Sequence, residues 1–164
     1  MLSGGCDIMQ DEIINKLKDV FTFDEEPHEF EGRIYMKISS DKLRDLALFV
    51  RNELGFTYGD MAYGTDTKEV MEMSWYVGHP ESHLILVLRS SGDREKPVFP
   101  TLSDLWEGFG WHEREAYDLL GIDFTDHKDL RRIYLPDNWE GHPLREDYVY
   151  KRPKYYKPED DLNV

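Results

Sequence analysis

The chain has 164 residues, of which 40% are hydrophobic and 33% charged, a composition typical of one globular domain rather than of a disordered chain. Its formal net charge of −14 disfavours binding to nucleic acid or to an anionic membrane surface, because both attract clustered lysine and arginine. The single cysteine, Cys6, excludes an intramolecular disulfide and any iron–sulfur cluster ligated by this chain alone.

Neither a secretory signal nor a membrane span is indicated. Residues 1–10 lack the basic start and the apolar run of a signal peptide. The longest apolar run, Leu84–Leu88, is far too short to cross a bilayer. We therefore expect a soluble chain with no direct membrane span, which reaches a membrane only through partner proteins.

The first half of the chain mixes helical and strand periodicity. Apolar residues recur with helical spacing over Asp11–Phe21 and again over Asp41–Leu54. Gly55 then suits the left-handed residue that follows the last turn of a helix. Between the two helices, Arg33–Ile38 alternates apolar and polar residues and is predicted to be a strand.

Three more predicted strands follow, over Phe56–Tyr63, Val70–Val77 and Ser82–Arg89, and Gly64-Thr65-Asp66 is predicted to be a turn. The connections between these consecutive strands are short, which favours antiparallel pairing, and the helices are expected on one face of the sheet. Residues 1–91 are therefore predicted to form an α+β domain, a small and mostly antiparallel sheet covered by helices.

The second half is less regular. Residues 92–100 are predicted to be a linker marked by proline, and residues 101–121 to hold two short helices, the first capped by Thr101 and the second over His112–Leu120. Residues 122–164 show little periodicity but many aromatics, and a segment so long without structure is uncommon inside a compact domain. We expect an extended docking tail that lies on another protein, with a disordered tail as the alternative.

Histidines and carboxylates after Trp111 are the candidates for a metal site. His112, His127 and His142 are widely spaced in the sequence. Ala116 stands one helical turn after His112, where a metallohydrolase would place a second histidine. Histidines that lie on the surface or form hydrogen bonds are the favoured interpretation, and a stand-alone metal-dependent hydrolase built on these residues is the alternative function.

A charge cluster on the second short helix and arginines beyond it favour docking over catalysis. On an isolated chain these helix charges would form a solvated face. As an alternative to docking, Arg114 and Glu115 would pair within the chain and pack the helix onto the chain's own tail. Arginine forks and large aromatics are preferred anchors of protein interfaces. The predicted interface residues are Glu113, Arg114, Asp118, His127, Arg131, Arg132, Trp139, His142 and Arg145.

These segments resemble one protein family. Trp111–Phe124 is similar to the signature of the C subunit (the 30 kDa-type subunit) of respiratory complex I, an NADH:quinone oxidoreductase. His127–Ile133 and Trp139–Arg145 match the same family in order and spacing. Family members commonly have proline where this chain has Lys128, and lysine where it has Glu146. Relatives of the family also serve membrane-bound hydrogenases, sulfur-reducing complexes and reduced-deazaflavin dehydrogenases.

The resemblance implies a non-catalytic structural and assembly subunit in the peripheral arm of a complex I-related, ion-translocating membrane oxidoreductase. It implies docking on the large hydrogenase-related subunit, near a small cluster-bearing subunit, on the cytoplasmic side of the membrane. Iron–sulfur clusters are expected on the partner subunits and no cofactor in this chain. A stand-alone binding module whose tail folds on its partner is a third possibility.

Overall fold

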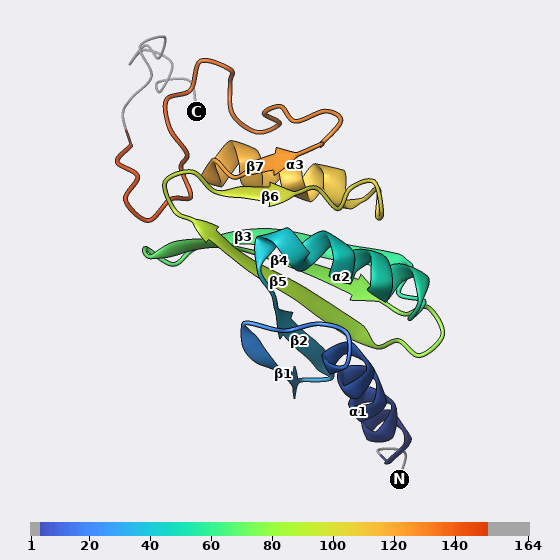
Figure 1. The fold of residues 1–164 in the computed structure, drawn as a ribbon. Coiled ribbons are helices and arrows are strands. Elements are labelled where there is room, and N and C mark those ends of the chain that lie inside the picture. The colour runs from blue at the N-terminus through green and yellow to red at the C-terminus, as the bar shows by residue number, and fades with distance from the viewer. Residues whose placement is uncertain (1–3, 151–164) are drawn as a thin grey trace, which may run out of the picture.

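A computed structural model describes residues 4–150 of the protein, with side chains from residue 10 onward. Five strands form one sheet in the order β1-β2-β5-β4-β3, in which only the β2–β5 pair is parallel, and β6 and β7 form a separate parallel pair (Figure 1). The predicted α+β fold with a mostly antiparallel sheet is confirmed. In chain order, the elements are α1 (Gly4–Lys18), β1 (Glu25–Phe30), β2 (Arg33–Lys37), α2 (Ser40–Asn52), β3 (Tyr58–Asp66), β4 (Val70–Gly78), β5 (Ile85–Asp93), β6 (Val98–Pro100), α3 (Phe109–Leu120) and β7 (Asp123–Thr125).

One contiguous core lies between the sheet and the helices, and Figure 1 shows α2 and α3 on the same side of the sheet. The strands present alternate side chains to this core, as the period of two requires. Helix α2 buries residues spaced by three and four positions, the pattern of an amphipathic helix. The buried set includes Ile34, Met36, Leu43, Leu46, Ala47, Val50, Met71, Met73, Trp75, Val77, Leu86 and Leu88.

Two local predictions are wrong. Gly64, Thr65 and Asp66 continue β3 and do not form a turn, because they pair in register with β4 and the chain reverses only at residues 67–69. Thr101 does not begin a helix, since residues 103–108 form turns and a bend and the next helix begins at Phe109. The Leu102 N–H, which would start that helix, instead bonds a side chain of α3.

The structure also adds elements that the sequence did not indicate. Strand β1 is mostly exposed and contains Pro27, so it carries no clear alternation of buried residues. The stretch 92–100, predicted to be a linker, holds the end of β5 and all of β6. The predicted docking tail begins with β7, and residues 126–150 then have no helix or strand, while 151–164 lie outside the described residues. None of the helices within residues 4–150 is long and apolar enough to span a membrane.

Gly64 marks the closest approach of α3 to the sheet, and it supplies a test of this packing. A Cβ at Gly64 would lie 2.7 Å from Leu120 Cδ1 and 2.8 Å from Ile122 Cδ1, both in the core. Gly64→Ala should therefore lower the free energy of unfolding by about 1–3 kcal/mol, the usual cost of overpacking. Urea denaturation measures this change. Gly108→Ala, where a Cβ meets nothing within 4 Å, is the matched control and should leave stability unchanged.

Candidate functional site

Helix α3 buries charged as well as apolar side chains. Phe109, Ala116 and Leu120 are buried among the core residues, where α3 packs on β3. Glu113 and Asp118 are completely buried too, although carboxylates are almost never fully buried unless paired. The charges of Glu113, Arg114 and Asp118 therefore lie inside the chain and not on a solvated helix face, while Glu115 is half-buried.

Three donors hold the Glu113 carboxylate. Its Oε1 accepts the Leu102 N–H at 2.9 Å and the Trp75 indole N–H at 3.3 Å, while Oε2 accepts the Thr101 hydroxyl. Burial raises the pKa of Glu113 to about 7, although these hydrogen bonds act in the opposite direction. His127 Nε2 lies 3.8 Å from Oε2, so an imidazole stands beside a carboxyl group that titrates near neutral pH.

The Asp118 carboxylate holds the tail, which we define as residues 126–150, against α3. Its Oδ2 accepts the backbone N–H groups of residues 133–135 at 2.7–3.0 Å, and its Oδ1 accepts the Arg132 guanidinium at 3.0 Å. Burial alone would raise the pKa of Asp118, but the three N–H donors and Arg132 outweigh it and lower the pKa. The ionised carboxylate thus anchors the middle of the tail.

Arg114 holds the beginning of the tail. Its Nε donates to the carbonyl oxygen of Arg131 at 3.2 Å, and its terminal nitrogen lies 3.6 Å from the Asp129 carboxylate. The guanidinium also stacks over the exposed ring of Trp111, 4.8 Å from the ring centre. Arg114 therefore does pack the helix onto its own tail, through Asp129 and not through Glu115.

The tail then returns to cap the C-terminal end of α3. The carbonyls of residues 118–120 have no partner within the helix, and each accepts a hydrogen bond from the tail. The donors are His142 Nδ1 at 2.9 Å, the Leu144 N–H at 3.0 Å and Arg145 Nε at 2.7 Å. Gly121 allows this return because its φ is 72° and a Cβ there would lie 2.6 Å from the His142 ring.

Arg94 ties the far end of the tail to the sheet. It donates to both oxygens of buried Asp66 at 2.7 Å and to Asp147 at 2.9 Å, while the Glu146 N–H donates to Asp66 at 3.0 Å. The bond from Arg94 holds the pKa of Asp66 well below its usual range, so this carboxylate is ionised at any ordinary pH. The tail is therefore fixed at its beginning, middle and end.

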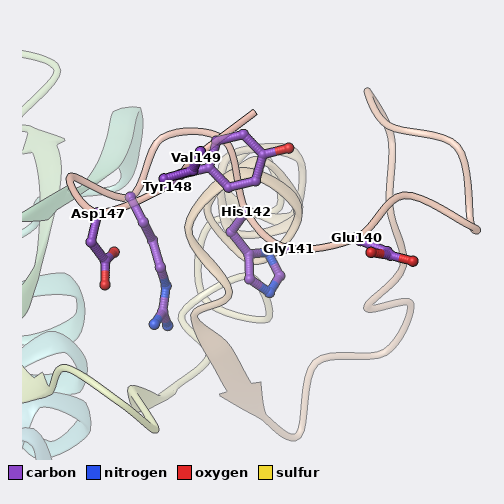
Figure 2. Close-up of a pocket in the computed structure, with 7 residues that line it drawn as sticks. Glu140, Gly141, His142, Asp147, Tyr148 and Val149 are labelled. Atoms are coloured by element: carbon purple, nitrogen blue, oxygen red, sulfur yellow. The ribbon is translucent and has the colours of Figure 1, made fainter. Parts of the chain in front are cut away.

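A cavity of about 490 Å³ opens beside this cap. In the view of Figure 2, His142 and Tyr148 lie between Glu140 on one side and Asp147 on the other. All the described residues that line it belong to the tail, so the cavity depends on the folded tail. Its lining residues are Glu140, Gly141, His142, Arg145, Asp147, Tyr148 and Val149.

The nine predicted interface residues all lie on α3 or the tail, and they differ in exposure. Glu113 and Asp118 are buried, so any influence on a partner passes through the tail that they hold. Arg131 is 68% exposed, and within residues 10–150 its side chain pairs with Asp129 alone. Trp139 buries its indole N–H with no acceptor inside the described part of the chain. Contact of these nine residues with a partner stays a prediction.

Several residues that complete these contacts are missing from the predicted site, among them Asp66, Arg94 and Thr101. The sequence patterns favour a turn at Asp66, a linker at Arg94 and a helix cap at Thr101, and none of these indicates a buried charge contact. Asp66 and Arg94 are 28 residues apart, so no local pattern connects them. The Asp147 partner of Arg94 lies 53 residues further along the chain.

The histidines serve separate purposes, and the alternative of a metal-dependent hydrolase finds no support in this arrangement. His127 bonds the Gly110 carbonyl oxygen and the Asp129 N–H, and His142 caps α3. The donors described above occupy the carboxylates of Glu113 and Asp118. Within residues 10–150, no three histidine, cysteine, aspartate or glutamate side chains converge as metal ligands would.

The fold and these contacts define a small α+β protein whose charged helix holds a C-terminal segment as an ordered surface. The chain belongs to the family of the 30 kDa subunit of respiratory-chain NADH dehydrogenase, which it matches over residues 36–154. The predicted family is thereby confirmed, and the protein is an oxidoreductase-complex subunit of the respiratory-chain type.

Two relatives and one solved structure show how similar the chain is to known proteins. The C subunit of the NADH-quinone oxidoreductase of Roseiflexus sp. (strain RS-1) is 35% identical over 124 residues, which cover 73% of this chain and 71% of that one. The C/D subunit of the same enzyme from Phocaeicola vulgatus is 50% identical over 64 residues, which cover 39% of this chain and 12% of that one. A chain of the membrane-bound sulfane sulfur reductase, an archaeal respiratory membrane complex, shares the fold with a TM-score of 0.74 at 21% identity, over 86% of each chain.

Proposed function

We propose that this protein is a structural and assembly subunit in the peripheral arm of a complex I-related membrane oxidoreductase, where it docks on the large hydrogenase-related subunit beside a small cluster-bearing subunit. It acts on the cytoplasmic side of the membrane and holds no cofactor, and electrons pass through iron–sulfur clusters on its partners. The family supports a subunit role. The relative named as a C/D subunit, of which the matched part is only 12%, supports a large neighbour.

The observation that carries this proposal is the fixed tail with large apolar side chains on its outside. Buried charge pairs and three helix carbonyls hold the tail, as described above. Large exposed apolar side chains in one region mark interaction sites more often than they mark bare solvent surface. On α3 and the tail the exposed large apolar residues are Trp111, Tyr134, Leu144, Val149 and Tyr150.

Affinity purification of the chain from its own membranes in mild detergent tests the proposal, with mass spectrometry and iron analysis as readouts. We expect a hydrogenase-related subunit and cluster-bearing subunits to co-purify, with iron that this chain cannot ligate. A chain that purifies alone with its own stoichiometric metal would refute the proposal and favour the hydrolase.

Arg131→Ala tests whether the tail makes the contact. The Arg131 side chain is 68% exposed, so its loss should leave the fold intact while assembly weakens by about 2–5 kcal/mol if a partner pairs with and buries its charge. Co-purification yield at increasing salt concentration measures the effect. Arg33→Ala, an arginine on β2 whose side chain is 39% exposed and pairs with Glu31, is the matched control. Equal yields from both variants would rule out the assigned contact.

A further inference from the structure

Arg145 stands apart from the other arginines of the described chain. Seven of the nine arginines within residues 10–150 lie within 4.0 Å of a carboxylate, and only Arg51 and Arg145 do not. Arg51 donates to the Leu105 carbonyl and to the Asn52 side chain. Arg145 donates only through Nε, to the Leu120 carbonyl, so both of its terminal nitrogens lack an acceptor among the described residues.

Arg145 is one of the residues that line the 490 Å³ cavity. The nearby acids do not neutralise it, because Asp147 is held by Arg94 and Glu140 lies beyond ion-pair distance of Arg145. The Tyr148 hydroxyl, also in the lining, makes no hydrogen bond to residues that the structure describes. In a chain with net charge −14, the cavity thus offers an unpaired cation and a free hydroxyl donor.

We propose that this cavity receives an aspartate or glutamate side chain of the partner subunit, which pairs with the terminal nitrogens of Arg145. The proposal rests on the docking function and specifies its chemistry. A carboxylate matches the planar guanidinium fork and accepts two parallel hydrogen bonds from it. Arginine anchors in pockets are typical centres of protein interfaces. Nε stays on the Leu120 carbonyl, so the pair is presented from a fixed point at the end of α3.

Carbodiimide coupling in the intact complex tests this pairing directly, because the reagent joins a lysine amine to a carboxylate in contact with it. The variant Arg145→Lys provides the amine, and mass spectrometry of the cross-linked complex identifies the carboxylate. Arg51→Lys is the matched control, since both arginines donate through Nε to one backbone carbonyl and both lack a carboxylate. In parallel, Arg145→Met should lower complex recovery at moderate salt on the order of tenfold or more.

Coupling of position 145 to an acidic residue of the partner, absent in the Arg51→Lys control, supports the proposal. Coupling only to acids of this chain, such as Glu140 or residues 159–161, overturns it. Normal recovery of the Arg145→Met complex also overturns it, while the docking function stands because the complex still forms. If the wild-type chain brings down no other protein of such a complex, the docking function fails and the pairing with it.

Discussion

Replacing Asp118 by alanine should lower the free energy of unfolding by about 3–5 kcal/mol, the cost of breaking a buried, hydrogen-bonded charge pair. The variant leaves the N–H groups of residues 133–135 and the Arg132 guanidinium without their acceptor. The middle of the tail should then detach from α3. Urea denaturation measures the loss, and limited trypsin digestion at Lys128 and Arg131 detects the detached tail.

Asp137→Ala is the matched control, because Asp137 is an exposed tail aspartate that makes no side-chain bond within the described residues. It should change the free energy of unfolding by less than about 0.5 kcal/mol. Asp118→Asn separates charge from shape, since an amide oxygen can still accept some of the N–H groups but cannot pair with Arg132 as an ion. A tail equally resistant to trypsin in Asp118→Ala and wild type would show that this carboxylate does not hold it.

Glu113→Gln should remove a pH dependence of stability. The pKa of Glu113 is raised from 4.5 to about 7 in the folded chain. Between these values the folded chain binds more protons than the unfolded chain, so the free energy of unfolding falls as the pH rises. The shift corresponds to about 3 kcal/mol in total, most of it lost between pH 5 and pH 8. Glutamine keeps an oxygen for the Leu102 N–H but cannot ionise, so the variant should lack this fall.

Urea denaturation of wild type and Glu113→Gln at pH 5, 6, 7 and 8 measures the difference between their free energies of unfolding. From pH 5 to pH 8 this difference should grow by about 2–3 kcal/mol, because wild type loses stability and Glu113→Gln does not. Burial lowers the pKa of His142, which gives stability the opposite slope below pH 6.5, but this contribution is common to both proteins and cancels. Glu107→Gln, at an exposed carboxylate, controls for the loss of one negative charge. Parallel curves for wild type and Glu113→Gln would contradict a protonation of Glu113 near neutral pH.

The sequence predicted the elements that carry a strong period. Helix α2 and strands β2 and β4 were found within a few residues of their ends, because their apolar residues repeat at 3.6 or 2.0 positions. Strand β5 was found from its nearly continuous apolar run. Strand β1 escaped because its residues are mostly exposed. Gly64 suggested a turn, whereas its missing Cβ serves the close approach of Leu120 and Ile122.

The charged site was only half predictable. Glu113, Arg114 and Asp118 were singled out, but they were expected on a surface because charge on a short helix is normally solvated. Several of their partners are backbone groups that lie 11 to 17 residues away, and backbone groups leave no mark in the sequence. The family resemblance led to the prediction of these residues as interface contacts, which stays a prediction, and only the structure shows that Glu113, Arg114 and Asp118 are buried.

The carbonyls of residues 118–120 and the Asp118 carboxylate give the tail its shape before any partner arrives. Fixing the backbone of one residue costs about 1–2 kcal/mol, and a segment that folds on its partner loses that amount from its affinity. In a tail already fixed by α3, this conformational entropy is lost when the chain folds and not when the partner binds. Its partner would therefore encounter a rigid template, and association would be limited by orientation and diffusion rather than by a folding step.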